Sequence, residues 1–119
     1  MNGRALRSTR HDGVLDPATE ALMAKAYWIA NYRSIKDPAA LEAYAKLAGP
    51  AIGAAGGRIV VRGMPAKTLE AGLNLRTVVI EFDNVTSAVA AYDSPGYRAA
   101  RELLGDSVER DIRIVEAAE

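Results

Sequence analysis

Three predicted strands carry bulky apolar side chains at consecutive positions, which limits the folds open to this chain. Trp28-Ile29, Ile59-Val60-Val61 and Val78-Val79-Ile80 place such groups on both faces of a strand. A sheet with one face in water alternates apolar and polar residues instead. A whole exposed apolar face would also exceed what a soluble monomer carries. We therefore expect both faces of the sheet to be covered.

The order of elements predicts how one face is covered. Helices are expected after the capping residues Asp37, Asn84 and Ser94. Gly49-Pro50 predicts a kink in the first helix or its division into two abutting helices. Strands are expected over 25–33, 58–62, 75–82 and 111–116. This βαββαβ order predicts an α+β, ferredoxin-like fold with an antiparallel sheet and its helices on one face.

The second face is then free for another copy of the chain. Two such sheets packed face to face form a dimeric α+β barrel, so we expect a homodimer through the open sheet face. Residues 23–119 are expected to form this domain. Residues 1–22 are expected to be an extension from a leader or an upstream start, or else an arm that packs on the domain or a partner. The sequence has no apolar run of 18 residues, so we expect no membrane partner and a cytoplasmic location.

Composition excludes several kinds of chemistry. The chain of 119 residues has no cysteine and one histidine, His11, which precedes the predicted domain. Thiolate chemistry is therefore excluded, and we expect no metal site and no haem or other cofactor. Lys plus Arg and Asp plus Glu both number 15, which argues against a nucleic-acid partner. Acid–base work in the domain would fall to Asp, Glu, Tyr, Lys or Arg.

Several segments resemble the family catalogued as domain of unknown function 1330, and the resemblance covers about residues 24–118. The segments are Ala24–Ala30, Gly56-Gly57-Arg58, Val78–Phe82, Tyr92–Ala100 with its Ser-Pro-x-Tyr motif, and Ile114-Val115-Glu116. The resemblance implies a ferredoxin-like protomer of the dimeric α+β barrel superfamily. That superfamily includes cofactor-independent monooxygenases, isomerases of small lactones and haem enzymes. The family itself carries no established activity to transfer.

Glu81 and two arginines are candidate site residues. Glu81 lies on the strand face opposite Ile80, and desolvation there would raise its pKa toward the range of a catalytic acid or base. Its alternative role is a surface ion pair. Arg58 and Arg62 are expected on one face of the second strand, where either binds a small carboxylate or pairs with Glu81. Arg62 is the ligand-binding candidate of the two.

A second group of candidates lies at the start of the last helix and on the first strand and helix. Tyr97 follows the Ser94-Pro95 cap, where its phenol would orient or protonate a ligand, or its ring would close the barrel mouth. Its neighbour Arg98 is a further ligand-binding candidate. Three further candidates are Trp28, Asn31 and Tyr44. By residue type alone, this set is similar to the polar residues that line the cavity of the superfamily's monooxygenases. The alternative is that these residues only pack in the core.

These residues lead to three hypotheses. The first is a pocket between sheet and helices that is monooxygenase-like or isomerase-like and acts on a small organic acid or phenol without a cofactor. Tyr97 and Glu81 are its predicted catalytic residues. The second is a non-catalytic metabolite-binding or regulatory module that uses the same pocket. The third is a filled barrel with only an assembly role.

Overall fold

The structure is a computed structural model that describes residues 24–118. The extension predicted at 1–22 lies outside these described residues. No helix of the described part is long and apolar enough to cross a membrane. The elements are β1 (Ala26–Ile35), α2 (Pro38–Ala54), β2 (Arg58–Gly63), β3 (Thr77–Phe82), α3 (Val85–Asp93), α4 (Pro95–Leu104) and β4 (Val108–Glu116).

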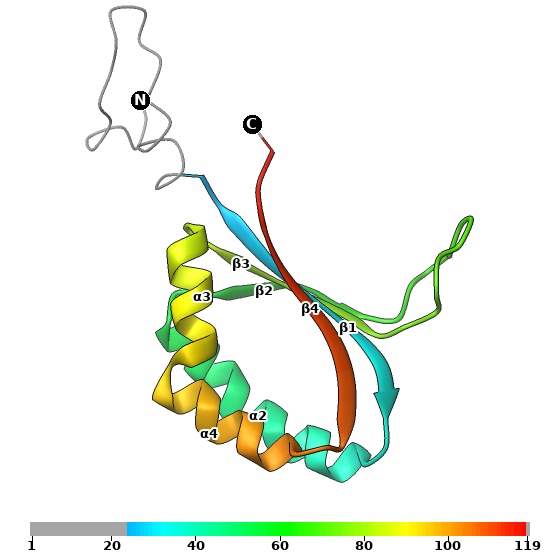
Figure 1. The fold of residues 1–119 in the computed structure, drawn as a ribbon, viewed down its shortest axis with the longest axis horizontal. Coiled ribbons are helices and arrows are strands. Elements are labelled where there is room, and N and C mark those ends of the chain that lie inside the picture. The colour runs from blue at the N-terminus through cyan, green and yellow to red at the C-terminus, as the bar shows by residue number, and fades with distance from the viewer. Residues whose placement is uncertain (1–23, 119) are drawn as a thin grey trace, which may run out of the picture.

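The predicted α+β, ferredoxin-like fold is confirmed. The four strands form one sheet in the order β2-β3-β1-β4, and all neighbouring strands are antiparallel. The three helices lie together on one face of this sheet, as Figure 1 shows. The other face is left open in the single chain.

Side-chain caps begin the helices where the sequence predicted. The carboxylate of Asp37 accepts hydrogen bonds from the backbone N–H groups of Ala39 and Ala40 at 3.1 and 3.3 Å. The Asn84 and Ser94 side chains begin α3 and α4 in the same way. The predicted alternative of two abutting helices at Gly49-Pro50 is wrong, because α2 continues through Pro50. Pro50 is exposed, so water can bond the carbonyl that its missing N–H leaves free.

The last strand begins earlier than predicted. β4 starts at Val108 and not at residue 111, since the polar residues Glu109 and Arg110 also pair with the end of β1. This difference matters for the site, because it makes Arg110 part of the sheet. Alternation along β4 then places Arg110 on the same face as Ile112 and Ile114, which pack against the core.

An aromatic cluster forms the centre of the core. Trp28 is only 1% exposed. Its ring centre lies 6.1 Å from that of Phe82, 5.6 Å from Tyr92 and 5.0 Å from Tyr97, which meets it edge-on. β1 and β3 thus pack against α3 and α4 through rings, and this packing fixes Tyr97 within the core.

The close approach of the chain at Gly57 gives a testable prediction. A Cβ atom at Gly57 would lie 2.6 Å from Ile52 Cγ2 and 2.7 Å from Phe82 Cζ. We expect Gly57→Ala to lower the free energy of unfolding by about 1–3 kcal/mol through overpacking. Gly53→Ala is the control, because nothing lies within 4 Å of a Cβ there. Urea denaturation measures both, and equal effects of the two changes would contradict the predicted overlap.

The open face of the sheet has an apolar centre. Val61, Val79 and Ile29 lie side by side across β2, β3 and β1 in the strand register. Val61 is 48% exposed, and Val79 and Ile29 are partly exposed. We call these three residues the open-face patch. Apolar side chains that remain in water across three strands are typical of a surface that another protein covers.

Candidate functional site

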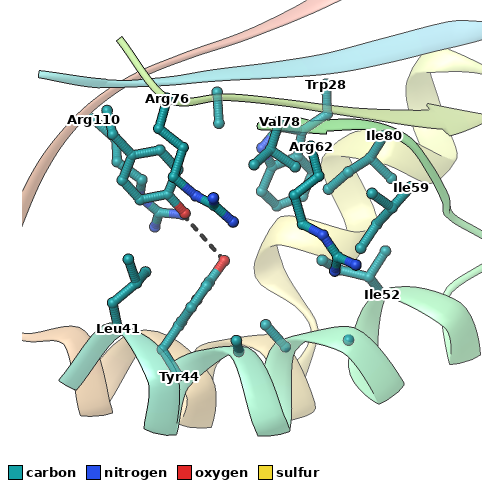
Figure 2. Close-up of a pocket in the computed structure, with 15 residues that line it drawn as sticks. Trp28, Leu41, Tyr44, Ile52, Ile59, Arg62, Arg76, Val78, Ile80 and Arg110 are labelled. Carbon is teal, nitrogen blue, oxygen red and sulfur yellow. Dashed lines mark hydrogen bonds between the residues drawn. The ribbon is translucent and has the colours of Figure 1, made fainter. Parts of the chain in front are cut away.

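A cavity of about 90 Å³ lies between the sheet and α2. A single water needs about 10–15 Å³ on this scale, so the cavity has room for a small molecule. Figure 2 shows Tyr44 and Leu41 rising from α2 toward Arg76 and Arg110, with Arg62 entering from the other side. Apolar side chains complete the wall, including Trp28, Ile52, Ile59, Val78 and Ile80.

Two arginines flank Tyr32 in one row across the sheet. Arg110 is the register partner of Tyr32 on β4, and the backbone N–H of Tyr32 donates to the Arg76 carbonyl at 2.9 Å on the other side. The guanidinium carbons of Arg76 and Arg110 lie 6.0 and 5.7 Å from the centre of the Tyr32 ring. Stacking on this ring holds both cations at the same end of the cavity.

A pair of buried tyrosines positions Arg110. The hydroxyl oxygens of Tyr44 and Tyr97 lie 2.6 Å apart. Arg110 Nη1 donates to both, at 3.1 and 3.2 Å, and the first of these bonds is the dashed line in Figure 2. The two hydroxyls carry two protons, and their mutual bond uses one of them. One phenolic proton is therefore free to donate to a ligand.

Burial and hydrogen bonding set the charge of this cluster. Burial raises the pKa of Tyr44 well above its ordinary value, so its phenol is protonated at neutral pH. Burial acts to lower the pKa of Arg110, but the neighbouring oxygens of Tyr44 and Tyr97 outweigh it and the pKa is raised. Arg110 is therefore a cation held beside the neutral phenol of Tyr44.

The cavity is rich in hydrogen-bond donors and poor in acceptors. No Asp or Glu side chain lines it among the described residues. Within residues 24–118, the ion pairs of arginine involve Arg33, Arg58 and Arg113, and none involves a cavity arginine. The Nε atom of Arg76 is buried without a hydrogen-bond partner. Unpaired buried polar groups in native proteins need an explanation.

A β-bulge separates the two arginines of β2. The register with β3 shifts between Ile59 and Val61, so that Arg58 pairs opposite Glu81 and Arg62 opposite Val78. Arg58 therefore contacts Glu81 on the open face, and Arg62 turns to the cavity. The prediction that both arginines share one face is wrong, because the extra residue of the bulge reverses the alternation.

The structure brings together some of the predicted site residues and separates others. The cavity is lined by Trp28, Tyr44 and Arg62. Tyr97 is not part of the lining, but its hydroxyl is hydrogen-bonded to that of Tyr44. Asn31 and Glu81 do not line it. They lie on the open face, because their positions alternate with those of the core residues.

Two of the separated residues have other partners. Asn31 Oδ1 accepts a hydrogen bond from Thr77 Oγ1 at 3.0 Å. Arg98 is exposed on α4, and its guanidinium donates to the Asp93 backbone carbonyl at 3.3 Å. The catalytic and ligand-binding roles of all these residues stay predictions.

Glu81 is a paired carboxylate on the open face. Arg58 donates to its Oε1, and the Tyr27 hydroxyl donates to its Oε2 at 2.9 Å. The hydrogen bond from Arg58, followed by that from Tyr27, lowers the pKa of Glu81. The raised pKa expected from the sequence is therefore wrong in the single chain, because hydrogen bonds to the charged form outweigh desolvation.

The lowered pKa of Glu81 predicts a pH effect on stability. A carboxyl whose pKa is lower in the folded than in the unfolded state stabilises the fold at pH values above its unfolded pKa. This stabilisation is lost as the pH falls through the folded pKa. We expect Glu81→Gln to destabilise the protein near neutral pH, and the difference from wild type to shrink below about pH 4.5. Urea midpoints across this range test it, with the exposed Glu102→Gln as control. A difference independent of pH would contradict the assigned pairing.

Sequence reasoning missed Arg76 and Arg110. Arg110 lies before residue 111, where the last strand was predicted to begin. Had the strand been extended to include it, alternation with Ile112 would have placed Arg110 on the core face. Arg76 lay within the predicted third strand and shares a face with Val78, which was a usable signal. The described residues hold no group of three or more His, Asp or Glu side chains that could bind a metal ion.

The fold and its cavity define the class of protein. The fold is that of a ferredoxin-like α+β protein, with one sheet face open and a cavity between the other face and α2. The chain belongs to the family described as Domain of unknown function (DUF1330), whose family model matches residues 25–118. No curated protein matches the chain.

Solved structures share the fold at low sequence identity. A protein of unknown function from Rhodopseudomonas palustris is 16% identical, with a TM-score of 0.64, and the match covers 82% of this chain and 85% of that one. SnoaB, a cofactor-independent oxygenase from Streptomyces nogalater, is 13% identical, with a TM-score of 0.57 over 81% and 95%. A putative antibiotic biosynthesis monooxygenase from Caulobacter crescentus is 12% identical, with a TM-score of 0.54 over 83% and 94%.

Proposed function

We propose that this protein is a homodimer that binds a small organic acid in the cavity between its sheet and α2. The observation that carries the proposal is the set of three cavity arginines without a carboxylate among the described lining residues. Arg76 and Arg110 are partly buried, and a buried charge is costly unless it is paired, so the cavity is suited to a ligand that brings a negative charge. The cytoplasmic location expected from the sequence stays a prediction.

The carboxylate of the ligand would lie at the Tyr32 end of the cavity. There Arg110 is fixed by two hydrogen bonds, and its remaining N–H groups are free to donate. Arg76 stands on the other side of Tyr32 with a buried, unpaired Nε. The free phenolic proton of the Tyr44–Tyr97 pair adds a neutral donor. This combination favours a carboxylate over an uncharged ligand.

The rest of the ligand would be apolar and small. Val78, Ile80 and Ile52 line the other part of the cavity together with the edge of Trp28. Apolar walls with a few directed polar groups are the usual composition of small-molecule sites. A short aliphatic acid or a small aromatic acid matches both ends of the cavity.

The open-face patch supports the homodimer. In a face-to-face dimer, each patch would pack against the other copy and leave water. Closed two-fold dimers are also the commonest soluble oligomers. The same assembly would bury the Glu81–Arg58 pair near the edge of the interface, which is compatible with burial because this carboxylate is already paired.

Catalysis is the second candidate function. The Arg110–phenol cluster could stabilise an oxyanion that develops on a bound substrate, which suits a monooxygenase-like or isomerase-like reaction. SnoaB, which shares the fold, is a cofactor-independent oxygenase. The described cavity lining offers no carboxylate or imidazole as a general base. Binding is therefore the function that its chemistry supports better.

The experiment uses the protein's own fluorescence. Trp28 is the only tryptophan and lines the cavity, so its emission reports what enters there. We expect valerate to change this emission in a saturable way, and the uncharged valeramide to have little effect. Equal effects of the acid and the amide, or no saturable change with either, would overturn the proposed function.

A further inference from the structure

The position of Arg62 is unusual for an arginine on an edge strand. β2 pairs with β3 alone and its residues 58–62 are exposed, and its bulge places Arg62 on the cavity side of the sheet. Bulges commonly occur next to functional sites, where they re-aim one side chain. Without the bulge, alternation would place Arg62 on the open face with Arg58. The local backbone thus adds a third cation to a cavity that already holds two.

Arg62 lies apart from the other two cavity arginines. Its register partner is Val78, two residues along β3 from Arg76. The spacing of residues and strands in a sheet places the Cα atoms of Arg62 and Arg76 about 8 Å apart. Figure 2 shows its guanidinium on the opposite side of the cavity from Arg76 and Arg110, near Ile52 and Ile59. A single carboxylate bound at the Tyr32 end therefore leaves Arg62 unpaired.

The surface between these two positions is apolar. Val78 and Ile80 on β3 line the cavity there. Among the described residues Arg62 makes no ion pair, whereas its strand neighbour Arg58 pairs with Glu81. An apolar wall with a cation at each end matches a carbon chain with an acidic group at each end.

We infer that the cavity binds a diacid, with one carboxylate held by Arg110 and Arg76 and the other by Arg62. This inference rests on the proposed binding of an organic acid and adds the second acidic group of the ligand. The carbon chain would lie against Val78 and Ile80. Arg62 is exposed, so its contribution is that of a partly solvated ion pair.

The test compares diacids with monoacids of the same number of carbons. Isothermal titration calorimetry of the full chain measures succinate, glutarate and adipate against butyrate, valerate and hexanoate. We expect at least one diacid to bind about three- to fivefold more tightly than its partner, the upper part of the range for one partly solvated ion pair. This preference should weaken as salt is raised, because the Arg62 end is open to solvent.

Variants of Arg62 separate the second carboxylate from the first. Arg62→Met should lower diacid affinity more than monoacid affinity, so that the preference falls to within about twofold, and Arg62→Lys should retain part of the preference. Lys46→Met removes an exposed charge from α2 and serves as control. Equal binding of diacids and monoacids, or equal weakening of both by Arg62→Met, would overturn the diacid inference and leave the proposed function standing. Failure of every acid to bind would overturn both.

Discussion

Replacing Arg110 with methionine should weaken the binding of valerate by about ten- to a hundredfold, the effect of one lost charge-assisted contact. Arg110 is the cavity cation that the structure holds most firmly, with hydrogen bonds to Tyr44 and Tyr97. Methionine keeps much of the side-chain length but carries no charge. The variant should stay folded, because the Tyr44–Tyr97 hydrogen bond and the ring packing remain.

The Trp28 titration measures this loss, and circular dichroism checks the fold. Lys46→Met again serves as control, since it removes a positive charge from the surface of α2 and should leave affinity unchanged. An Arg110→Met protein that binds valerate as the wild type does would place the acid elsewhere. Equal weakening by both variants would mean that net charge, and not the cavity, attracts the acid.

Val79→Lys should convert the proposed homodimer into a monomer. Val79 lies at the middle of the open-face patch, between Val61 and Ile29. In a two-fold dimer each substitution acts twice, so two ammonium groups would be buried without partners. Burying an unpaired charge typically costs several kcal/mol, which is enough to shift the dissociation constant of the dimer by orders of magnitude.

Sedimentation equilibrium at micromolar concentration measures this change. The control is Val89→Lys on the exposed side of α3, which is similarly apolar and lies away from the open face. It should remain a dimer. A wild-type monomer, or a Val79→Lys protein that remains dimeric, would show that the open-face patch is not the contact surface.

The fold could be predicted from the sequence because its signals are local. Asp37, Asn84 and Ser94 each begin a helix with their own side chain. The apolar character of both sheet faces also follows from consecutive positions such as Val78 and Val79. These features depend on neighbours within a few residues, which a sequence displays directly.

The candidate site was predictable only in part, because it depends on which face each side chain occupies. Trp28 and Tyr44 follow the helix-side pattern and line the cavity, and their ligand-binding role stays a prediction. The sheet face that Arg62 occupies depends on a bulge, and no residue type in this segment indicated a bulge. Arg110 depended on the true start of β4. One residue of shift reverses the face of every later side chain in a strand, so small boundary errors became errors in the site.

Glu81 illustrates a different error. Its face was predicted correctly relative to Val79, but its charge state was not. The sequence left open a desolvated carboxyl with a raised pKa and a surface ion pair, and the structure shows the second: Arg58 and Tyr27 both donate hydrogen bonds to the carboxylate and lower its pKa. Arg58 could be named as its alternative partner from the sequence, because both residues lie near the ends of neighbouring strands.

Native mass spectrometry of the untagged protein in the presence of valerate or glutarate tests the central claim most directly. We expect a species of twice the chain mass that carries one acid per protomer, and an Arg110→Met dimer that carries much less acid at the same concentration. A monomer without adduct would contradict both the dimer and the binding site. A dimer that never takes up an acid, at concentrations that saturate the Trp28 signal, would contradict the cavity as an organic-acid site.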